Sequence, residues 1–188
     1  MKKVYLDCGG YRGQTLDAFR KAYEDADEYE IHIFEPNTFI SRKFFDGVVF
    51  HDVAVWTENC TNKMYVNRKK KNASGSSMFK GITSGKLRKD KPITVKCIDF
   101  CEWIRANFTE QDYIVLKMNI EGAEYPILKK MIKDGTIWHI NVLYVSFHRK
   151  EIKLDKKVHD KLVKQLKGIA GLKVIERART HDLTGSEL

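Results

Sequence analysis

The sequence predicts an α/β protein with a doubly wound, mainly parallel sheet. Short runs of β-branched and aromatic residues alternate with segments of helical periodicity along most of the 188 residues. The first run, residues 4–6, passes through Asp7 into a glycine turn, after which residues 14–24 have helical spacing. This succession is typical of a nucleotide-binding loop, because glycine lets the backbone approach a ligand closely and a helix start offers free N–H groups.

The later elements follow in the same alternating order, with no internal repeat. Apolar side chains three to four residues apart indicate the helices, and Gly135 ends one of them. Pro126 falls within the pattern of that helix, in its first turn, where proline is tolerated. We expect strands at residues 29–36, 48–56, 93–98, 113–120, 137–147 and 172–178, and helices at residues 37–45, 100–108, 121–133 and 155–166.

Residues 57–92 break the alternation, although residues 64–66 have the composition of a short strand. This stretch is rich in Ser, Gly and Lys, and an insertion of this length is usually functional or disordered. Between residues 63 and 91, ten basic residues face one acid, so this segment carries +9, the net charge of the whole chain. We interpret it as a lid or substrate-facing loop, and the basic residues either attract an anionic partner or keep the loop solvated.

Composition indicates one domain over residues 1–188, with 43% hydrophobic and 31% charged residues. No apolar stretch approaches the ~20 residues needed to span a bilayer, and no signal-peptide pattern precedes the first strand, so we expect a soluble, cytoplasmic protein. The four cysteines lack the paired spacing of zinc sites and are expected to be reduced. The fold is expected to be minimal at both termini, as a small enzyme or as one domain of a longer polypeptide.

Polar residues at the ends of the first two strands indicate where a ligand binds. In parallel α/β sheets, ligands bind beyond the carboxyl ends of the strands. Asp7 lies two residues before Gly9, and Glu35 ends the second predicted strand. An acid at the position of Glu35 can accept hydrogen bonds from both hydroxyls of a ribose. Together these residues predict a nucleoside site.

Five motifs carry a resemblance to a known family. In chain order they are LDCGGYRGQT, FEP, HDVAVW, TVKCIDF and LKMNIEGAEYPIL, beginning at residues 6, 34, 51, 94 and 116. They are similar to the FkbM family of class I S-adenosylmethionine-dependent methyltransferases, whose fold is Rossmann-like. The resemblance implies S-adenosylmethionine as cofactor and Asp52 and Val53 beside the adenine. The cofactor-binding residues that we expect are Asp7, Gly9, Gly10, Tyr11, Gly13, Thr15, Glu35, Pro36, Asp52, Val53 and Asn119.

Methyl transfer requires alignment of donor and acceptor, and a base where the acceptor is a hydroxyl. Lys117, Asn119 and Glu121 alternate along the end of one predicted strand and so lie on one face. Lys117 is expected to be functional, the alternative being a structural ion pair with Glu121 or Glu124. We predict Lys117, Glu121, His148 and Asp99 as catalytic residues and no metal site.

The motif around Asn119 departs from the family pattern, which usually has an aspartate there. Asparagine cannot act as a base and binds divalent metals less strongly than a carboxylate. Glu121, and after it His148, are therefore the better candidates for the base. For His148 the alternative is a surface or hydrogen-bonded residue without a catalytic role.

Three functions remain open from the sequence. The first is an O-methyltransferase acting on a hydroxyl, which the resemblance assigns to a sugar, a glycan or a small metabolite. The second is an RNA 2′-O-methyltransferase whose basic residues 63–91 follow the phosphates, although few aromatic residues are interleaved there. The third, motivated by Asn119, is a catalytically silent cofactor-fold domain that acts as a binding module.

Overall fold

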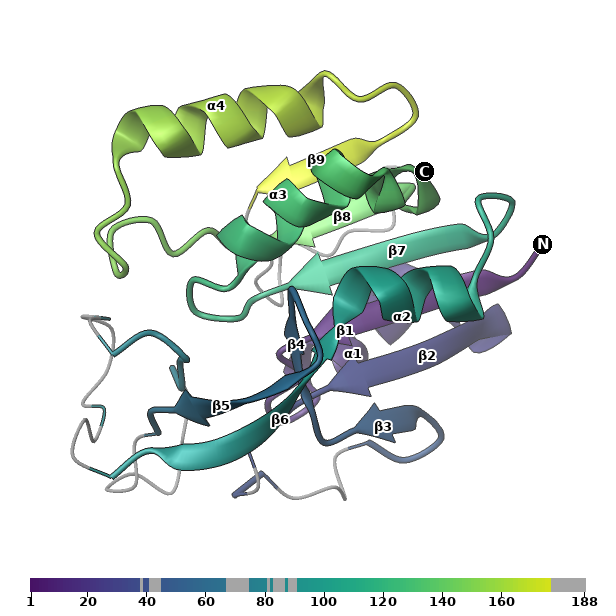
Figure 1. Cartoon of the computed structure of the whole chain (residues 1–188). Helices are drawn as coiled ribbons and strands as arrows, with labels where there is room; N and C mark the ends of the chain where they lie inside the picture. Colours follow the sequence, from purple (N-terminus) through teal and green to yellow (C-terminus); the bar gives the residue numbers. More distant parts are fainter. Residues whose placement is uncertain are drawn as a thin grey trace.

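A parallel sheet forms the centre of the protein, whose structure is a computed structural model (Figure 1). The structure describes residues 1–37, 39, 40, 45–66, 75–80, 82, 87 and 91–176. Within these residues, six strands pair in parallel in the order β3-β2-β1-β7-β8-β9. They are β1 (Lys3–Cys8), β2 (Tyr29–Phe34), β3 (Val49–His51), β7 (Tyr113–Met118), β8 (Val142–Val145) and β9 (Lys173–Glu176).

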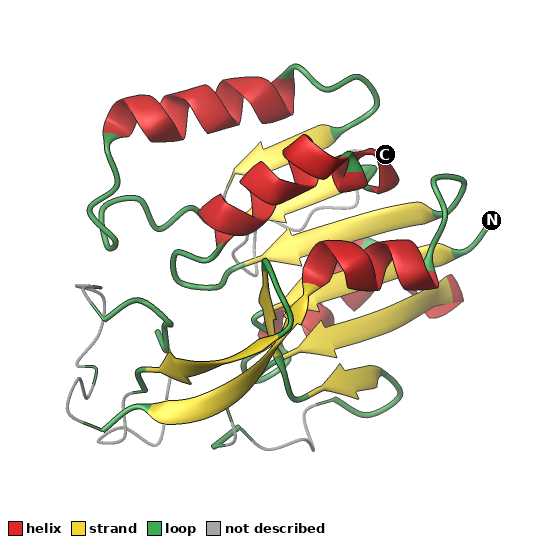
Figure 2. Cartoon of the chain, viewed as in Figure 1, coloured by secondary structure: helices red, strands yellow, loops and turns green. Residues whose placement is uncertain are grey.

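Helices cover both faces of this sheet, as Figures 1 and 2 show. On one face, α1 (Gln14–Ala22) stacks Phe19 on Tyr5 of β1, with ring centroids 3.9 Å apart. The opposite face carries α2 (Phe100–Asn107), α3 (Glu124–Asp134) and α4 (Lys156–Lys167). The predicted doubly wound α/β fold is therefore confirmed. Its strand order reverses between β1 and β7, which opens a crevice at the carboxyl ends of these two strands.

A second, three-stranded sheet lies beside the carboxyl ends of the central strands (Figure 1). It consists of β4 (Ala54–Trp56), β5 (Cys60–Met64) and β6 (Ile93–Asp99), with β6 between the other two. The prediction of a single strand at residues 48–56 is wrong. The strand is interrupted at Asp52 and Val53, so that β3 belongs to the central sheet and β4 to the second sheet. The segment predicted as a structureless insertion contains β5, whose antiparallel pairing with β6 gives it order.

Several strands and helices end about two residues earlier than predicted, and at two further places the kind of structure differs. The strand expected at residues 137–147 begins as the 3₁₀ helix η3 (Thr136–His139), because Gly135 adopts φ 81° and Ile137 is buried before the chain extends into β8. The helix expected from residue 121 begins at Glu124, because Glu121 and Gly122 have positive φ angles of 54° and 107°.

In the predicted helix 37–45, residues 38 and 41–44 lie outside the described residues. A short 3₁₀ turn, η1 (Ala26–Glu28), precedes β2.

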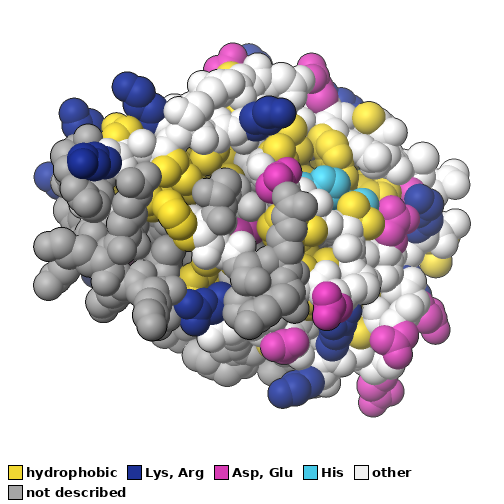
Figure 3. Space-filling view, turned by 90° about the horizontal axis from the view of Figure 1, so that it is seen from below, with side chains coloured by type: hydrophobic (Ala, Val, Ile, Leu, Met, Phe, Trp, Pro, Cys, Tyr) yellow, Lys and Arg dark blue, Asp and Glu magenta, His cyan; other side chains and the backbone are white. Residues whose placement is uncertain are grey.

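A cluster of rings joins α2 to the edge of the central sheet. His32 Nδ1 and His51 Nε2 lie 3.0 Å apart, and both rings pack edge-on against Trp103 of α2. Figure 3 shows histidine side chains surrounded by hydrophobic ones on the face seen from below. Burial and the neighbouring His32 lower the pKa of His51 to about 4, so His51 is neutral at pH 7.

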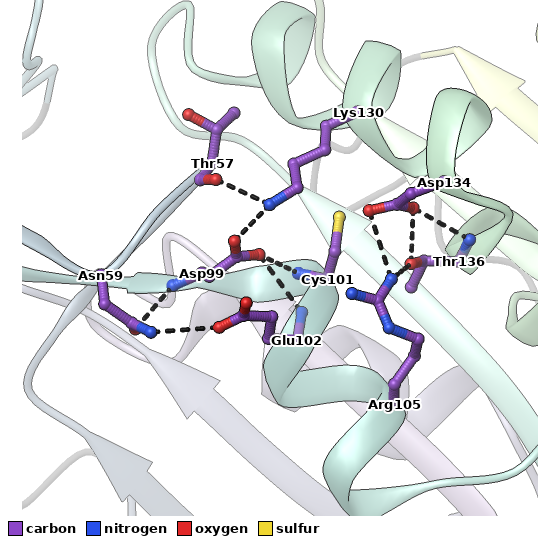
Figure 4. Close-up of polar contacts among 9 residues, drawn as sticks. All are labelled: Thr57, Asn59, Asp99, Cys101, Glu102, Arg105, Lys130, Asp134 and Thr136. Atoms are coloured by element: carbon purple, nitrogen blue, oxygen red, sulfur yellow. Dashed lines mark hydrogen bonds and ion pairs between the residues drawn. The ribbon is translucent and has the colours of Figure 1, made fainter.

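Asp99 fixes the second sheet to the helices (Figure 4). Its Oδ1 accepts hydrogen bonds from the backbone N–H groups of Cys101 and Glu102 and so caps α2. Its Oδ2 forms an ion pair with Lys130 of α3, whose Nζ also donates to the Thr57 carbonyl oxygen over 2.8 Å. Asp99, which was predicted as catalytic, thus caps α2 and links β6 to α2 and α3.

Substitution of Asp99 tests this structural role. We expect Asp99→Ala to lower the free energy of unfolding by about 1–2 kcal/mol, because α2 loses its cap. Asp99→Asn should cost less, since an asparagine side chain also caps a helix. Urea unfolding followed by circular dichroism measures both. Equal losses in the two variants would show that the cap contributes nothing.

Candidate active site

A cavity of about 290 Å³ lies at the carboxyl ends of β1, β2 and β7. Its floor is the glycine turn after β1, and residues of the second sheet form the opposite wall. The lining comes from the turn and the start of α1, from β2 and the loop after it, from β4 and β5, from residues 75–78 between β5 and β6, and from the loop after β7. The residues around it are Gly9, Tyr11, Gln14, Phe34, Glu35, Pro36, Asn37, Ala54, Val55, Met64, Gly75, Ser76, Ser77, Met78, Asn119, Ile120, Glu121 and Ala123.

The glycine turn fits tightly between β2 and β7. Gly9 has φ 87°, and a Cβ atom there would lie 2.3 Å from the carbonyl oxygen of Asn119. A Cβ atom on Gly10 would lie 2.3 Å from Cγ2 of Ile33. No side chain larger than hydrogen fits at either position without a shift of its neighbours. The turn therefore brings backbone to the cavity wall where side chains would otherwise fill the space.

Lys117 supports this turn from below. Its side chain is 1% exposed, and its Nζ lies 2.7 Å from Asp7 Oδ1 and 2.9 Å from the carbonyl oxygen of Gly9. Thr15 donates its hydroxyl to Asp7 Oδ2 over 2.5 Å. The ion pair is thus with Asp7, the neighbour of Lys117 in the β1–β7 register, and not with Glu121 or Glu124. Asp7, Thr15 and Lys117 lie beneath the cavity and do not line it.

Glu35 stands at the wall of the cavity, at the end of β2. Its Oε1 accepts a hydrogen bond from Asn37 N over 2.8 Å, and its Oε2 accepts one from Tyr11 N over 3.0 Å. Burial raises the pKa of Glu35, although the hydrogen bonds from Asn37 and Tyr11 oppose this shift. Each carboxylate oxygen can accept more than one hydrogen bond, so both can also accept from a ligand hydroxyl.

The apolar part of the lining differs from the prediction by a shift of two residues. Asp52 and Val53 are not among the lining residues, whereas Ala54 and Val55 of β4 are. The turn at Asp52 and Val53 carries the chain from one sheet to the other, and only after it does β4 face the cavity. Met64 of β5 also contributes, from the segment predicted as a lid.

A second cavity of about 510 Å³ adjoins the first. It lies beyond the carboxyl end of β8 and shares Asn119 and Glu121 with the first cavity. Most of its lining is polar or charged. The residues around it are Asn119, Glu121, Val145, Ser146, Phe147, His148, Arg149, Lys150, Glu151, His159 and Glu176.

His148 and two glutamates stand where the cavities meet. Nδ1 of His148 lies 2.9 Å from Glu124 Oε1, and its Nε2 lies 3.5 Å from Glu121 Oε1. Burial lowers the pKa of His148, but the Glu124 hydrogen bond and the charges of Glu124 and Glu121 outweigh it and raise the pKa above 6.5. The sequence predicted Glu121 and His148 as catalytic residues, but it indicated Glu124 only as a possible ion-pair partner of Lys117.

Asn119 is held by its backbone, not by its side chain. Its N–H donates to the Cys8 carbonyl oxygen over 3.1 Å. Within the part of the chain that the structure describes, its side-chain amide makes no hydrogen bond. The amide group lies at the junction of the two cavities and can bind a ligand in either.

Comparison with known proteins decides the family. Residues 7–168 match the family model of the methyltransferase FkbM domain. The chain belongs to the FkbM methyltransferase family. Searches of curated proteins and of solved structures gave no match. The predicted family, enzyme class and cofactor are thereby confirmed: this FkbM methyltransferase uses S-adenosylmethionine.

The residues of the first cavity fit this cofactor. The backbone of Gly9, which lines the cavity without a side chain, and the carboxylate of Glu35 suit the backbone and ribose contacts of a nucleoside. The apolar side chains of Phe34, Val55 and Met64 suit the face of an adenine.

Other predicted features of this FkbM methyltransferase fall partly outside the described residues. Of the basic residues between 63 and 91, the structure describes Lys63, Lys80 and Lys91, and the others lie outside it. Ser76 and Ser77, which it does describe, line the first cavity. Their Ser- and Gly-rich surroundings carry no periodic signal that would have placed them there. In the described segments no helix is long and apolar enough to cross a membrane.

Replacement of Glu35 tests the cofactor site. We expect Glu35→Gln to weaken the binding of S-adenosylhomocysteine about 10- to 100-fold, because a charged acceptor of ribose hydrogen bonds is lost. Isothermal titration calorimetry measures the dissociation constant. The control is Glu30→Gln on the same strand, whose carboxylate pairs with Lys2 away from the cavity. Unchanged affinity in Glu35→Gln would remove Glu35 from the site.

The raised pKa of His148 predicts a pH-dependent stability. A group whose pKa is higher in the folded state stabilises the fold fully below its unfolded pKa, about 6.5, and loses this contribution as pH rises through the folded value. The wild type should therefore lose stability relative to His148→Gln as the pH rises above about 6.5. Urea unfolding at a series of pH values measures the difference. A difference that is constant with pH would contradict the ion-paired state of His148.

Proposed function

We propose that this FkbM methyltransferase is an O-methyltransferase that acts on a hydroxyl of a sugar, a glycan or a small metabolite. The observation that carries the proposal is the contact of two cavities at Asn119 and Glu121. The first cavity suits a nucleoside, and the second, with its polar lining, suits an acceptor that carries hydroxyl groups. The reacting atoms would then meet beside Glu121.

The cofactor site is assigned to the turn after β1 and to the end of β2. Glu35 accepts hydrogen bonds from the ribose hydroxyls, while the backbone of Gly9 and Gly10 allows close approach. Lys117 and Asp7 act indirectly, by holding the turn in place. Asn119 offers an amide group to the cofactor or the acceptor.

The chemistry needs one base and close alignment. When bound, S-adenosylmethionine would supply a methyl group for in-line transfer to the acceptor oxygen, with S-adenosylhomocysteine as the leaving group. Glu121 takes the proton of the acceptor hydroxyl, because its carboxylate lines both cavities. His148, whose Nε2 lies 3.5 Å from Glu121 Oε1, would place a positive charge beside that carboxylate when it is protonated.

The lining of the second cavity supports a polar acceptor. Ser146, His159 and Glu151 offer donors and acceptors of hydrogen bonds, and Phe147 adds one aromatic surface. Positive and negative side chains are mixed around this cavity, which gives no single charge for a polyanion to follow. These features favour a neutral, hydroxyl-rich acceptor over RNA.

A screen followed by one substitution tests the proposal. Transfer of radiolabelled methyl is measured over sugars, glycans, hydroxylated metabolites and capped RNA. With the acceptor so identified, Glu121→Gln should lower kcat about 10²- to 10⁴-fold, the usual contribution of a general base. The affinity for S-adenosylhomocysteine should stay within about twofold, since Glu35 is untouched.

The control is Glu110→Gln, an exposed residue in the loop before β7. Wild-type kcat in Glu121→Gln would remove Glu121 as the base. Methylation of RNA alone would overturn the assigned acceptor class, and methylation of a nitrogen or carbon would overturn the O-methyltransferase assignment.

A further inference from the structure

A buried carboxylate lies directly behind the proposed base. The Glu124 side chain is 0% exposed and lines neither cavity. It occupies the first position of α3, where negative charge is favourable beside the helix N-terminus. Burial of a glutamate costs free energy of folding unless its oxygens accept hydrogen bonds. The partners of Glu124 therefore indicate its role.

Those partners surround Glu121. Oε1 of Glu124 accepts the N–H of Ile120 over 2.9 Å, and Oε2 accepts the N–H of Gly122 over 2.8 Å. The two donors are the residues on either side of Glu121, which itself has φ 54°. A left-handed conformation costs energy for a residue with a Cβ atom, and such a conformation persists only where its surroundings hold it. Glu124 supplies that support from below.

The same carboxylate also holds the ring of His148. Because an ionised carboxylate only accepts hydrogen bonds, Nδ1 of His148 must be the donor in its 2.9 Å contact with Glu124 Oε1. This leaves Nε2 pointing to Glu121, 3.5 Å away. One buried side chain thus fixes both the backbone of Glu121 and the orientation of its neighbouring imidazole.

We propose that Glu124 is a positioning residue for methyl transfer. It holds the backbone of Glu121 and the ring of His148 in a fixed arrangement where the two cavities meet. It acts through these residues and touches neither substrate nor cofactor. The inference rests on the proposed function in so far as Glu121 is the base. The tautomer and the titration midpoint of His148, which the proposal predicts, can be measured without any methyl acceptor.

Several charged groups face His148 and set its protonation. Glu121 lies in the loop after β7, Glu124 at the start of α3 and Glu151 in the loop after β8, and all three favour the imidazolium. His159 of α4 and Arg149 line the same cavity and bring positive or titratable groups. Glu124 accepts a hydrogen bond from the ring, at Nδ1. Its loss should therefore change the state of His148 more than the loss of Glu151.

The first experiment is an NMR titration of the histidine side chains in the full chain, with His148 assigned by comparison with His148→Asn. In the wild type, the midpoint should lie above the ordinary value, and the neutral ring should keep its proton on Nδ1, as long-range ¹⁵N correlations report. In Glu124→Gln the midpoint should fall, and in the matched control Glu151→Gln it should fall less. A wild-type ring protonated on Nε2, or an unchanged midpoint in Glu124→Gln, would overturn the proposal.

The second experiment is kinetic. With the acceptor from the screen, Glu124→Gln should lower kcat at least about tenfold, while S-adenosylhomocysteine affinity stays within about twofold. The effects of Glu124→Gln and His148→Asn should not add in the double variant, because both act on the same contact. Additive effects would overturn the proposal. If Glu124→Gln does not fold, the wild-type tautomer alone decides the outcome.

The two proposals fail in different ways. If no hydroxyl acceptor is methylated, the proposed function fails, while the NMR titration still reports whether Glu124 holds His148. If Glu121→Gln loses activity but the Glu124 variant keeps full kcat with a shifted His148 midpoint, the base stands and the positioning role falls.

Discussion

The ion pair between Asp7 and Lys117 is the interaction on which the cofactor site depends. Both charges are buried, and removal of one partner from such a pair typically costs about 3–5 kcal/mol because the other charge is left uncompensated. Here the pair is completed by the Thr15 hydroxyl and the Gly9 carbonyl oxygen. It therefore joins β1, β7 and the start of α1 at one point, directly under the glycine turn. These contacts hold the turn in place at the cavity.

The second sheet forms the wall of the first cavity opposite the glycine turn. The central sheet provides the turn and Glu35, whereas Val55 and Met64 of the second sheet close the cavity opposite them. Because the two sheets do not share strands, their relative position depends on side chains such as Asp99, which links β6 to α2 and α3. The cap of one helix thus contributes to the shape of a cavity that it does not line.

Local sequence patterns predicted the local features of the site. They did not predict the pairings between residues that are distant in the sequence. The glycine turn and Glu35 follow strands of clear β composition, so their place at the sheet edge could be read from spacing. The partner of Lys117 could not, because Asp7 is 110 residues away and only the strand register brings them together. The move of the chain from β3 to β4 also escaped, since a continuous apolar run conceals a change of sheet.

Asn119 places a neutral amide beside Glu121 where the two cavities meet. An amide can donate and accept hydrogen bonds, but it cannot take a proton as a base. Of the two residues that line both cavities, Glu121 is therefore the acid. Ser77 donates its hydroxyl to the Glu121 carbonyl oxygen over 2.8 Å, and Glu124 binds the flanking N–H groups. The acid at the cavity junction thus lies on a loop whose backbone is held by hydrogen bonds at Glu121 and at the residues on either side of it.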